Sequence, residues 1–167
     1  SWINDGFVTN FMFYGQLPTT LSQVEKMIVD QFSSPANVVF MVCDNATQKP
    51  IGFAGLYDMH LTARKAEFRV LIGESDFWVN GYGTEVTQLL TFFGFDSMNM
   101  HRMYLGVTSE NLGAIKAYEN AGYVREGQLR DDIYRNSRYY DSIKMSLLRE
   151  EYYEKYYEEH KKLFTTE

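Results

Sequence analysis

Gly81-Tyr82-Gly83-Thr84-Glu85 is the segment that decides how this chain is interpreted. It follows an alternating stretch, Lys65 to Gly73, and opens a long segment whose apolar residues recur at helical spacing. Glycines ahead of a helix let backbone amides approach a ligand, and the free N–H groups and dipole of the helix N-terminus favour a phosphate there. A second segment, Asn111 to Tyr118 with Ala121-Gly122-Tyr123, comes about thirty residues later. Together the two predict a pyrophosphate-bearing cofactor on one helix and a reactive group on the next.

Composition limits the possible functions. The chain has 167 residues, a length typical of one domain, and we expect a single domain over residues 1–167. Its formal net charge of −6 argues against a nucleic-acid partner and is compatible with a cationic substrate. No apolar run reaches the ~20 residues of a membrane span, and no signal peptide is visible, so we expect no membrane partner and a cytoplasmic location.

The few cysteines and histidines give no sign of a metal site. Cys43 is the single cysteine, so it forms no internal disulfide, and its apolar surroundings predict a buried thiol. His60, His101 and His160 lack the spacing of metal ligands, and we expect no metal.

Hydrophobic patterning predicts a mixed, mostly antiparallel sheet flanked by helices, which is an α+β fold. In the strand Lys65–Ile72 we expect Ala66, Phe68, Val70 and Ile72 on one face and Lys65, Glu67 and Arg69 on the other. Residues 148–167 form a charged helical extension, and no strand precedes Trp2, so the N-terminal strand of such a sheet is expected to be missing. The predicted strands are 38–43, 51–59, 65–72, 102–107, 123–128 and 141–147, and the predicted helices are 19–32, 84–98 and 111–121, the last capped by Ser109.

At this point the residues resemble the GCN5-related N-acetyltransferase (GNAT) superfamily, in particular the branch of bacterial spermidine N-acetyltransferases and ribosomal-protein N-terminal acetyltransferases. The resemblance runs from about Ile51 to Tyr152, and the order and spacing of its blocks carry it. These blocks are Ala66-Glu67-Phe68, Gly81 to Glu85, Asn111 to Tyr118, Gly122-Tyr123 and Glu126-Gly127-Gln128-Leu129-Arg130.

The resemblance implies a V-shaped acetyl-CoA cleft between splayed strands. The pantetheine arm would pair with the strand edge Phe68 to Ile72, where a bulge would aim a backbone N–H at the thioester carbonyl. Trp78 departs from the family pattern, which usually has Gln or Arg at that position. The cofactor-binding residues implied are Phe68, Arg69, Val70, Trp78, Val79, Asn80, Gly81, Tyr82, Gly83, Thr84, Asn111, Ala114 and Tyr118.

Acetyl transfer to an amine requires a base, because an alkyl ammonium has a pKa near ~10 and is almost wholly protonated at pH 7. Glu67 is the candidate base, and its alternative role is an ion pair with Arg69 or Lys65. Asp58 and His60 are further candidates. Tyr118 matches the family's tyrosine acid, which would protonate the departing thiolate; alternatively it is a core tyrosine.

The resemblance therefore predicts an acetyl-CoA-dependent N-acetyltransferase acting on a primary amine, either a polyamine or another small amine. Alternatives are an amino-sugar nucleotide or protein N-terminal acetyltransferase, a non-catalytic acyl-CoA-binding module, and a structural subunit. The tyrosines 152, 153, 156 and 157 of the terminal segment would pack on the sheet or on another subunit, so a homo-oligomer is possible.

Overall fold

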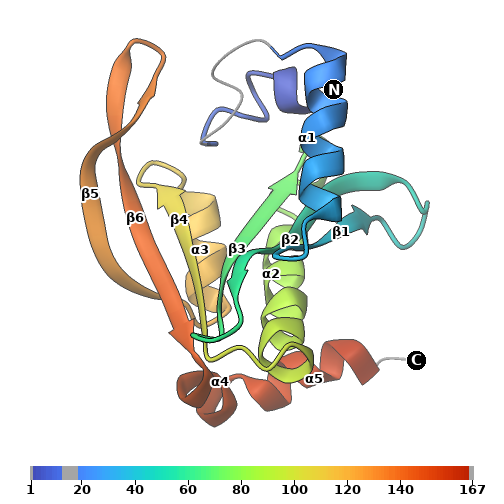
Figure 1. The fold of residues 1–167 in the computed structure, drawn as a ribbon, viewed down its shortest axis with the longest axis vertical. Helices are drawn as coiled ribbons and strands as arrows, with labels where there is room; N and C mark the ends of the chain where they lie inside the picture. The colour runs from blue at the N-terminus through green and yellow to red at the C-terminus, as the bar shows by residue number, and fades with distance from the viewer. Residues whose placement is uncertain (1, 13–18, 166–167) are drawn as a thin grey trace.

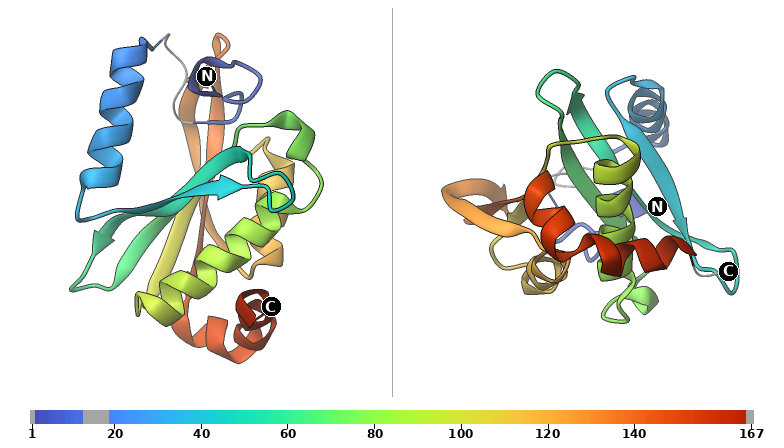
Figure 2. Two further views of the ribbon diagram at one scale, coloured as in Figure 1. Left: turned by 90° about the vertical axis from the view of Figure 1, so that its right-hand side faces the viewer. Right: turned by 90° about the horizontal axis from the view of Figure 1, so that it is seen from below.

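The computed structural model describes residues 2–12 and 19–165. Six strands form one sheet in the order β1-β2-β3-β4-β6-β5 (Figure 1). Helix α1 lies on one face of the sheet, and α2 and α3 lie on the other (Figure 2). The strands are β1 (Val38–Cys43), β2 (Pro50–His60), β3 (Lys65–Ile72), β4 (Arg102–Thr108), β5 (Val124–Arg135) and β6 (Arg138–Leu148). The helices are α1 (Leu21–Ser33), α2 (Tyr82–Phe92), α3 (Leu112–Asn120), α4 (Arg149–Lys155) and α5 (Tyr157–Thr165).

The sheet is mixed, as predicted. β1, β2 and β3 are antiparallel, while β4 runs parallel to β3 after the crossover through α2. β5 and β6 form a long hairpin that returns antiparallel to β4. Asn136 and Ser137, at its turn, both have positive φ, which suits the tight turn of a two-residue hairpin.

β3 and β4 separate soon after they meet. They pair only at Lys65–Arg102, Ala66–Met103 and Glu67–Tyr104, although β3 continues to Ile72. Figure 1 shows the two strands diverging from this point. The backbone groups of residues 68–72 that face β4 therefore have no ladder partner in β4.

The main core lies between the sheet and the helices α2 and α3, and Phe68, Met103, Leu105 and Met145 are almost fully buried there. The predicted alternation of β3 holds as far as Arg69, but Leu71 is then more buried than Val70 or Ile72. The N-terminal segment lies over this end of β3 and covers it. The Trp2 ring occupies the space beside Gly73, and its Nε1 donates to Glu74 Oε1 at 2.8 Å.

Helix α1 begins at Leu21, two residues after its predicted start. Thr20 and Gln23 form a reciprocal capping box at its N-terminus. Its buried side chain is Val24, with Met27 and Gln31 half-buried, whereas the apolar side chains at the same helical spacing as Val24 are exposed: Leu21, Ile28 and Phe32.

Two helix boundaries differ from the prediction. Helix α2 starts at Tyr82 and gives way at Phe93 to a π-helical turn, Phe93–Ser97, so the predicted single helix 84–98 is wrong in its second half. The cap of α3 is Asn111 rather than Ser109, because the Asn111 Oδ1 accepts from the Ala114 N–H at 3.2 Å. Gly122 ends this region in the left-handed conformation, which glycine adopts readily.

The terminal segment forms two short helices that cross beneath α2 (Figure 2). Tyr152 stacks on Phe95 at 4.8 Å and Tyr157 stacks on Phe92 at 5.8 Å, so these tyrosines pack on the chain itself. Cys43 is exposed at the end of the edge strand β1, which corrects the prediction of a buried thiol. Among the described residues no helix is long and apolar enough to cross a membrane.

Candidate active site

The two predicted catalytic residues lie on opposite faces of the sheet, next to the point where β3 leaves β4. Glu67 is the last β3 residue paired with β4, and it shares its face with its register partners Tyr57 and Tyr104. Phe68 follows on the opposite face and meets the ring of Tyr118 edge to face, with centroids 5.9 Å apart. A thioester between the diverging strands would therefore have a carboxylate on one side and a phenol on the other.

The face that carries Glu67 holds a cluster of charged groups centred on Arg69. Its Nη2 lies 2.6 Å from Glu67 Oε2 and 3.0 Å from Asp58 Oδ2, and its guanidinium lies 4.6 Å from the centroid of the Tyr57 ring. Burial lowers the pKa of Arg69, but the hydrogen bond and charge of Glu67, with the charge of Asp58, outweigh burial and raise it. The ion pair with Arg69 expected as the alternative role of Glu67 is thus formed.

A bulge brings Asp58 into this cluster. Between Tyr57–Glu67 and His60–Lys65 the strand β2 carries one residue more than β3, and Asp58 has a φ of 50°. A bulge of this kind re-aims side chains. The resemblance predicted a bulge at residues 68–70 of β3, and that prediction is wrong: β3 pairs with β2 without irregularity from Glu67 to Ile72.

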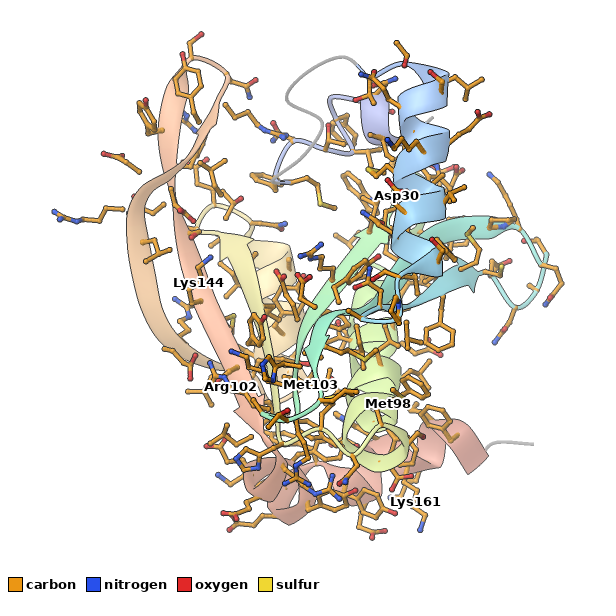
Figure 3. The ribbon with its side chains drawn as sticks, in the orientation of Figure 1. Asp30, Met98, Arg102, Met103, Lys144 and Lys161 are labelled. Atoms are coloured by element: carbon orange, nitrogen blue, oxygen red, sulfur yellow. The ribbon has the colours of Figure 1, made fainter. Side chains whose placement is uncertain are left out.

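The neighbouring strands extend the polar face. Tyr104 of β4 has its pKa raised by burial and by the charges of Glu67 and Asp58. Arg102 holds Glu126 of β5 through two parallel hydrogen bonds of 2.7 and 2.5 Å, which lower the pKa of Glu126 to about 2. Figure 3 labels Arg102 of β4 and Lys144 of β6.

Tyr118 sits on the inner side of α3, where it is 9% exposed. Phe68 and Tyr123 both contact its ring edge to face. Tyr123 is fully engaged in the core, since its hydroxyl lies 3.2 Å from that of Thr91 and burial raises its pKa. Both rings contact Phe68, with centroids 5.9 Å from it for Tyr118 and 6.1 Å for Tyr123, and Tyr118 is the less buried of the two tyrosines.

The predicted phosphate loop forms the N-terminus of α2. Gly81 is the N-cap with a φ of 88°, and a side chain added at Gly83 would meet no atom within 4 Å. The first N–H groups of a helix have no partner within the helix. Val79 is also left-handed, with a φ of 56°, and is fully exposed, which is a strained conformation for a β-branched residue. This loop offers unshielded backbone to a ligand.

Several side chains of the loop are occupied by contacts within the protein. Trp78 Nε1 donates to the Ile72 carbonyl at 2.8 Å and its ring stacks on Phe7, which ties the loop to the end of β3. Asn80 donates to the Asp76 carbonyl, and the Tyr82 hydroxyl donates to Asp44 Oδ1 at 3.3 Å. Phosphate contacts from Trp78, Asn80 and Tyr82 would therefore come from the backbone. Asn111 likewise uses its side-chain oxygen on α3.

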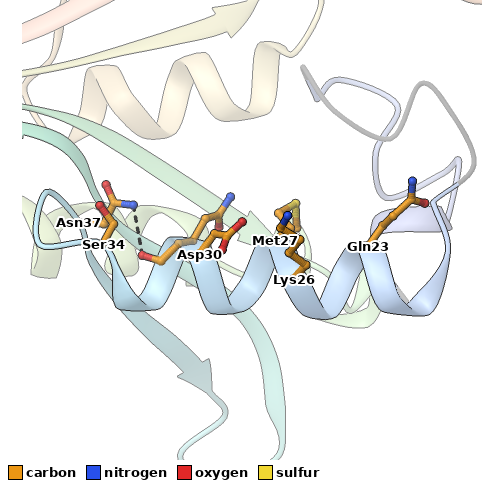
Figure 4. Close-up of a pocket in the computed structure, with 7 residues that line it drawn as sticks. Gln23, Lys26, Met27, Asp30, Ser34 and Asn37 are labelled. Atoms are coloured by element: carbon orange, nitrogen blue, oxygen red, sulfur yellow. Dashed lines mark hydrogen bonds between the residues drawn. The ribbon is translucent and has the colours of Figure 1, made fainter.

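Two hollows lie away from the junction of β3 and β4. A cavity of about 740 Å³ runs between β1 and α2, reaches the loop at Asn80 and Tyr82, and is covered at its other end by Phe164. A hollow of about 420 Å³ follows α1 and contains Lys26 and Asp30; the Asn37 side chain donates to the Gln31 carbonyl beside it (Figure 4). Neither holds Glu67 or Tyr118. Within residues 2–12 and 19–165, no group of three or more His, Cys, Asp and Glu residues could hold a metal ion.

Sequence reasoning missed Tyr57, Tyr104 and the Arg102–Glu126 pair. Alternation along β2 and β4 could have placed both tyrosines on the Glu67 face once the pairing was known. No local pattern in the sequence predicts the pairing of β2 and β4 with β3, or the bulge at Asp58.

Comparison with known proteins identifies the family of this chain. Residues 1–124 match the family described as an acetyltransferase (GNAT) domain. The spermidine N(1)-acetyltransferase of Vibrio cholerae is 31% identical over 111 residues, which are 66% of this chain and 64% of that relative's length. The structure of the Vibrio cholerae spermidine N-acetyltransferase in complex with CoA and spermine is 26% identical, with a TM-score of 0.83 over 91% of this chain and 88% of that one. A dodecameric structure of the same enzyme has a TM-score of 0.73 with 26% identity, over 87% and 86% of the two chains.

The family match covers most of the chain and the fold agrees with it, so this chain belongs to the GNAT acetyltransferase family and has its fold.

Proposed function

We propose that this chain is an acetyl-CoA-dependent N-acetyltransferase whose acceptor is a primary amine, with polyamines as the first class to test. The observation that carries the proposal is the divergence of β3 and β4 at Glu67, with Tyr118 on the opposite face. The N-terminus of α2, the proposed pyrophosphate site, adjoins the end of the same strand through Trp78. The relatives that act on spermidine support the choice of acceptor.

In this proposal the pantetheine arm lies along β3 from Phe68, where the backbone groups facing β4 have no partner in that strand, as far as Ile72, whose carbonyl accepts from Trp78. The pyrophosphate lies over residues 79–84, against the free N–H groups of α2. Asn111 and Ala114 line the start of α3 beside the arm. The amine approaches from the opposite face of the sheet, which carries Glu67.

The chemistry is a direct transfer. The amine nitrogen forms a bond to the thioester carbonyl carbon and the carbon–sulfur bond breaks. Glu67, directly or through water, takes the proton that the amine loses, and Asp58 is the alternative acceptor of that proton. Tyr118 gives a proton to the thiolate, since a phenol with a pKa near ~10 is matched to an alkyl thiol.

The test is release of free thiol from acetyl-CoA with a panel of amines: spermidine, spermine, butylamine, an amino sugar nucleotide and a peptide with a free N-terminus. Release with the polyamines at the highest kcat/KM supports the proposal. A higher kcat/KM with the amino sugar nucleotide or the peptide would mean that this compound class, and not the polyamines, is the acceptor. Binding of CoA by calorimetry without thiol release from any amine would instead identify a non-catalytic acyl-CoA-binding module.

We also propose that the chain forms a homo-oligomer, since a structural neighbour is a dodecamer. Sedimentation equilibrium tests this directly, and a monomer at assay concentration would contradict it.

A further inference from the structure

The Arg69 side chain binds both carboxylates that are candidates for the base. One guanidinium nitrogen contacts Glu67 at 2.6 Å and Asp58 at 3.0 Å. The two carboxylates come from different strands, and Asp58 reaches Arg69 only because of the bulge in β2. An exposed ion pair contributes little to stability, so stability alone is a weak reason for this arrangement.

A free carboxylate at the acceptor position would have a disadvantage for amine acetylation. An opposite charge within about 4–6 Å stabilises the charged form of an ionisable group. Glu67 alone would therefore hold the incoming amine as an ammonium, which has no lone pair for attack. A nearby cation has the reverse effect and favours the neutral amine.

We propose that Arg69 is a positioning residue for the acetyl transfer, which fixes the Glu67 and Asp58 carboxylates and prevents them from holding the acceptor as an ammonium. This inference rests on the proposed function. Arg69 acts through its side chain, which is 42% exposed on the face opposite Tyr118. Its proximity to the reacting nitrogen follows from the place of Glu67 at the junction of β3 and β4.

Within the described part of the chain, other charged and titratable groups lie near Arg69, and one of them is Lys65, two residues before Glu67 on β3. Tyr57 lies under the guanidinium and Tyr104 lies opposite Glu67, and burial raises the pKa of both phenols. Arg102 is paired with Glu126. His60, at the end of β2, accepts a hydrogen bond on Nδ1 from the Ala63 N–H within its own turn. The pH profile of each Arg69 variant is therefore compared with that of the parent, in which Tyr57, Tyr104 and His60 are also present.

The experiment compares the parent with Arg69→Gln and Arg69→Lys from pH 6.5 to 9.5, with spermidine and with the single cation butylamine. In Arg69→Gln we expect KM to fall, because the ammonium binds better. We also expect kcat at pH 7 to fall about tenfold, because the rising limb of the kcat-against-pH profile moves up by about one pH unit. Arg69→Lys keeps the positive charge and should leave the limb within a few tenths of a unit of the parent. The control is Arg138→Gln, which breaks a comparable ion pair with Glu110 (2.9 Å) at the far end of the hairpin and should change none of these values.

The outcomes separate the inference from the proposed function. A parent protein that releases no thiol with any amine would overturn the proposed function and this inference with it. An active parent with an unmoved limb in Arg69→Gln would overturn only the inference. A purely structural Arg69 predicts a lower melting temperature, parallel changes in kcat and KM, and no rescue by Arg69→Lys, and that result would also overturn it.

Discussion

Glu67 and Tyr104 form the last residue pair at which β3 and β4 run side by side. The sheet opens from the next residue, Phe68, whose side chain points toward Tyr118. Glu67 on the polar face and Phe68 on the aromatic face are consecutive residues, and both lie where the gap between β3 and β4 begins. Substitutions of Glu67 and Tyr118 therefore test the two sides of this gap.

Replacing Tyr118 with Phe removes a hydroxyl and keeps the ring that packs on Phe68 and Tyr123. We expect CoA affinity and the melting temperature to be nearly unchanged, while turnover with a saturating amine falls by roughly 10²-fold, the scale of a positioned acid. Steady-state kinetics and thermal melting measure both. Unchanged turnover would leave Tyr118 as a core residue only.

The Glu67→Gln variant should lose most of its rate near neutral pH. There the amine is protonated and a base is needed; toward pH 9 to 10 the free-amine fraction rises by itself, because the pKa of the amine is near ~10. A pH–rate profile from 7 to 10 should show the defect shrinking. If the defect is constant and KM is unchanged, the base is not Glu67, and Asp58 and His60 are the next residues to test. If Glu67 serves only to attract a cation, added salt should mimic its loss.

A valine at position 83 should weaken CoA binding without unfolding the protein. The space beside Gly83 is empty, so a branched side chain fits but stands where a phosphate must approach. We expect a loss of about tenfold or more in affinity, the size of one lost hydrogen bond to a charged group. Calorimetry with CoA measures it. Gly127→Val is the matched control, because that glycine on β5 also has open space around it; equal affinities of the two variants would move the phosphate site elsewhere.

Val79→Gly should stabilise the protein. Valine is strained at a φ of 56°, by about 1–3 kcal/mol, while glycine adds about 0.5–1 kcal/mol of unfolded-state entropy. The net expectation is a gain of about 1 kcal/mol in the free energy of unfolding, measured by urea titration. Val79→Ala, which keeps a Cβ, should gain less. Lower stability of Val79→Gly than of the parent would mean that the left-handed conformation is not formed in solution.

His160 should make stability depend on pH. It lies on α5 with its ring fully buried against Tyr152 of α4 and Tyr156, and neither ring nitrogen has a hydrogen-bond partner among the described residues. Burial lowers its pKa, so the unfolded chain binds a proton first as the pH falls below about 6.5. The contribution of neutral His160 is therefore complete above pH 6.5 and is lost progressively below it.

His160→Met keeps most of the side-chain volume and removes the two unpartnered nitrogens. We expect it to unfold with less pH dependence between 6.5 and 5 and to be about 1 kcal/mol more stable at pH 7. Urea unfolding at several pH values checks both. A parent whose stability does not change across this range would show that the His160 nitrogens are hydrated or bonded in solution.

The order and type of the elements could largely be predicted from the sequence, because alternation and helical spacing report which residues are buried. The strands Val38–Cys43 and Lys65–Ile72 have the predicted bounds. The end of α2 could not be predicted, since Phe93 to Ser97 keep an apolar pattern that does not distinguish a π turn from an α-helix. The Trp2 ring beside Gly73 brings together two segments that are far apart in the chain, which local patterning does not report.

The candidate site was predictable only in part. A glycine pair before a helix and an alternating strand have local signatures, so the loop at Gly81 and the face of Glu67 could be assigned. The Arg69 contacts depend on the bulge at Asp58, which follows from pairing between β2 and β3 rather than from either segment alone.

The divergence of β3 and β4 gives the sheet an edge inside the molecule as well as at its margins. Unpaired strand edges template the addition of other strands, and proteins ordinarily protect them. A ligand that pairs with residues 68–72 would give this edge its protection, so solubility and occupancy of the site are linked. The empty protein should be the form most prone to self-association on concentration, and CoA should be a suitable additive for keeping it dispersed.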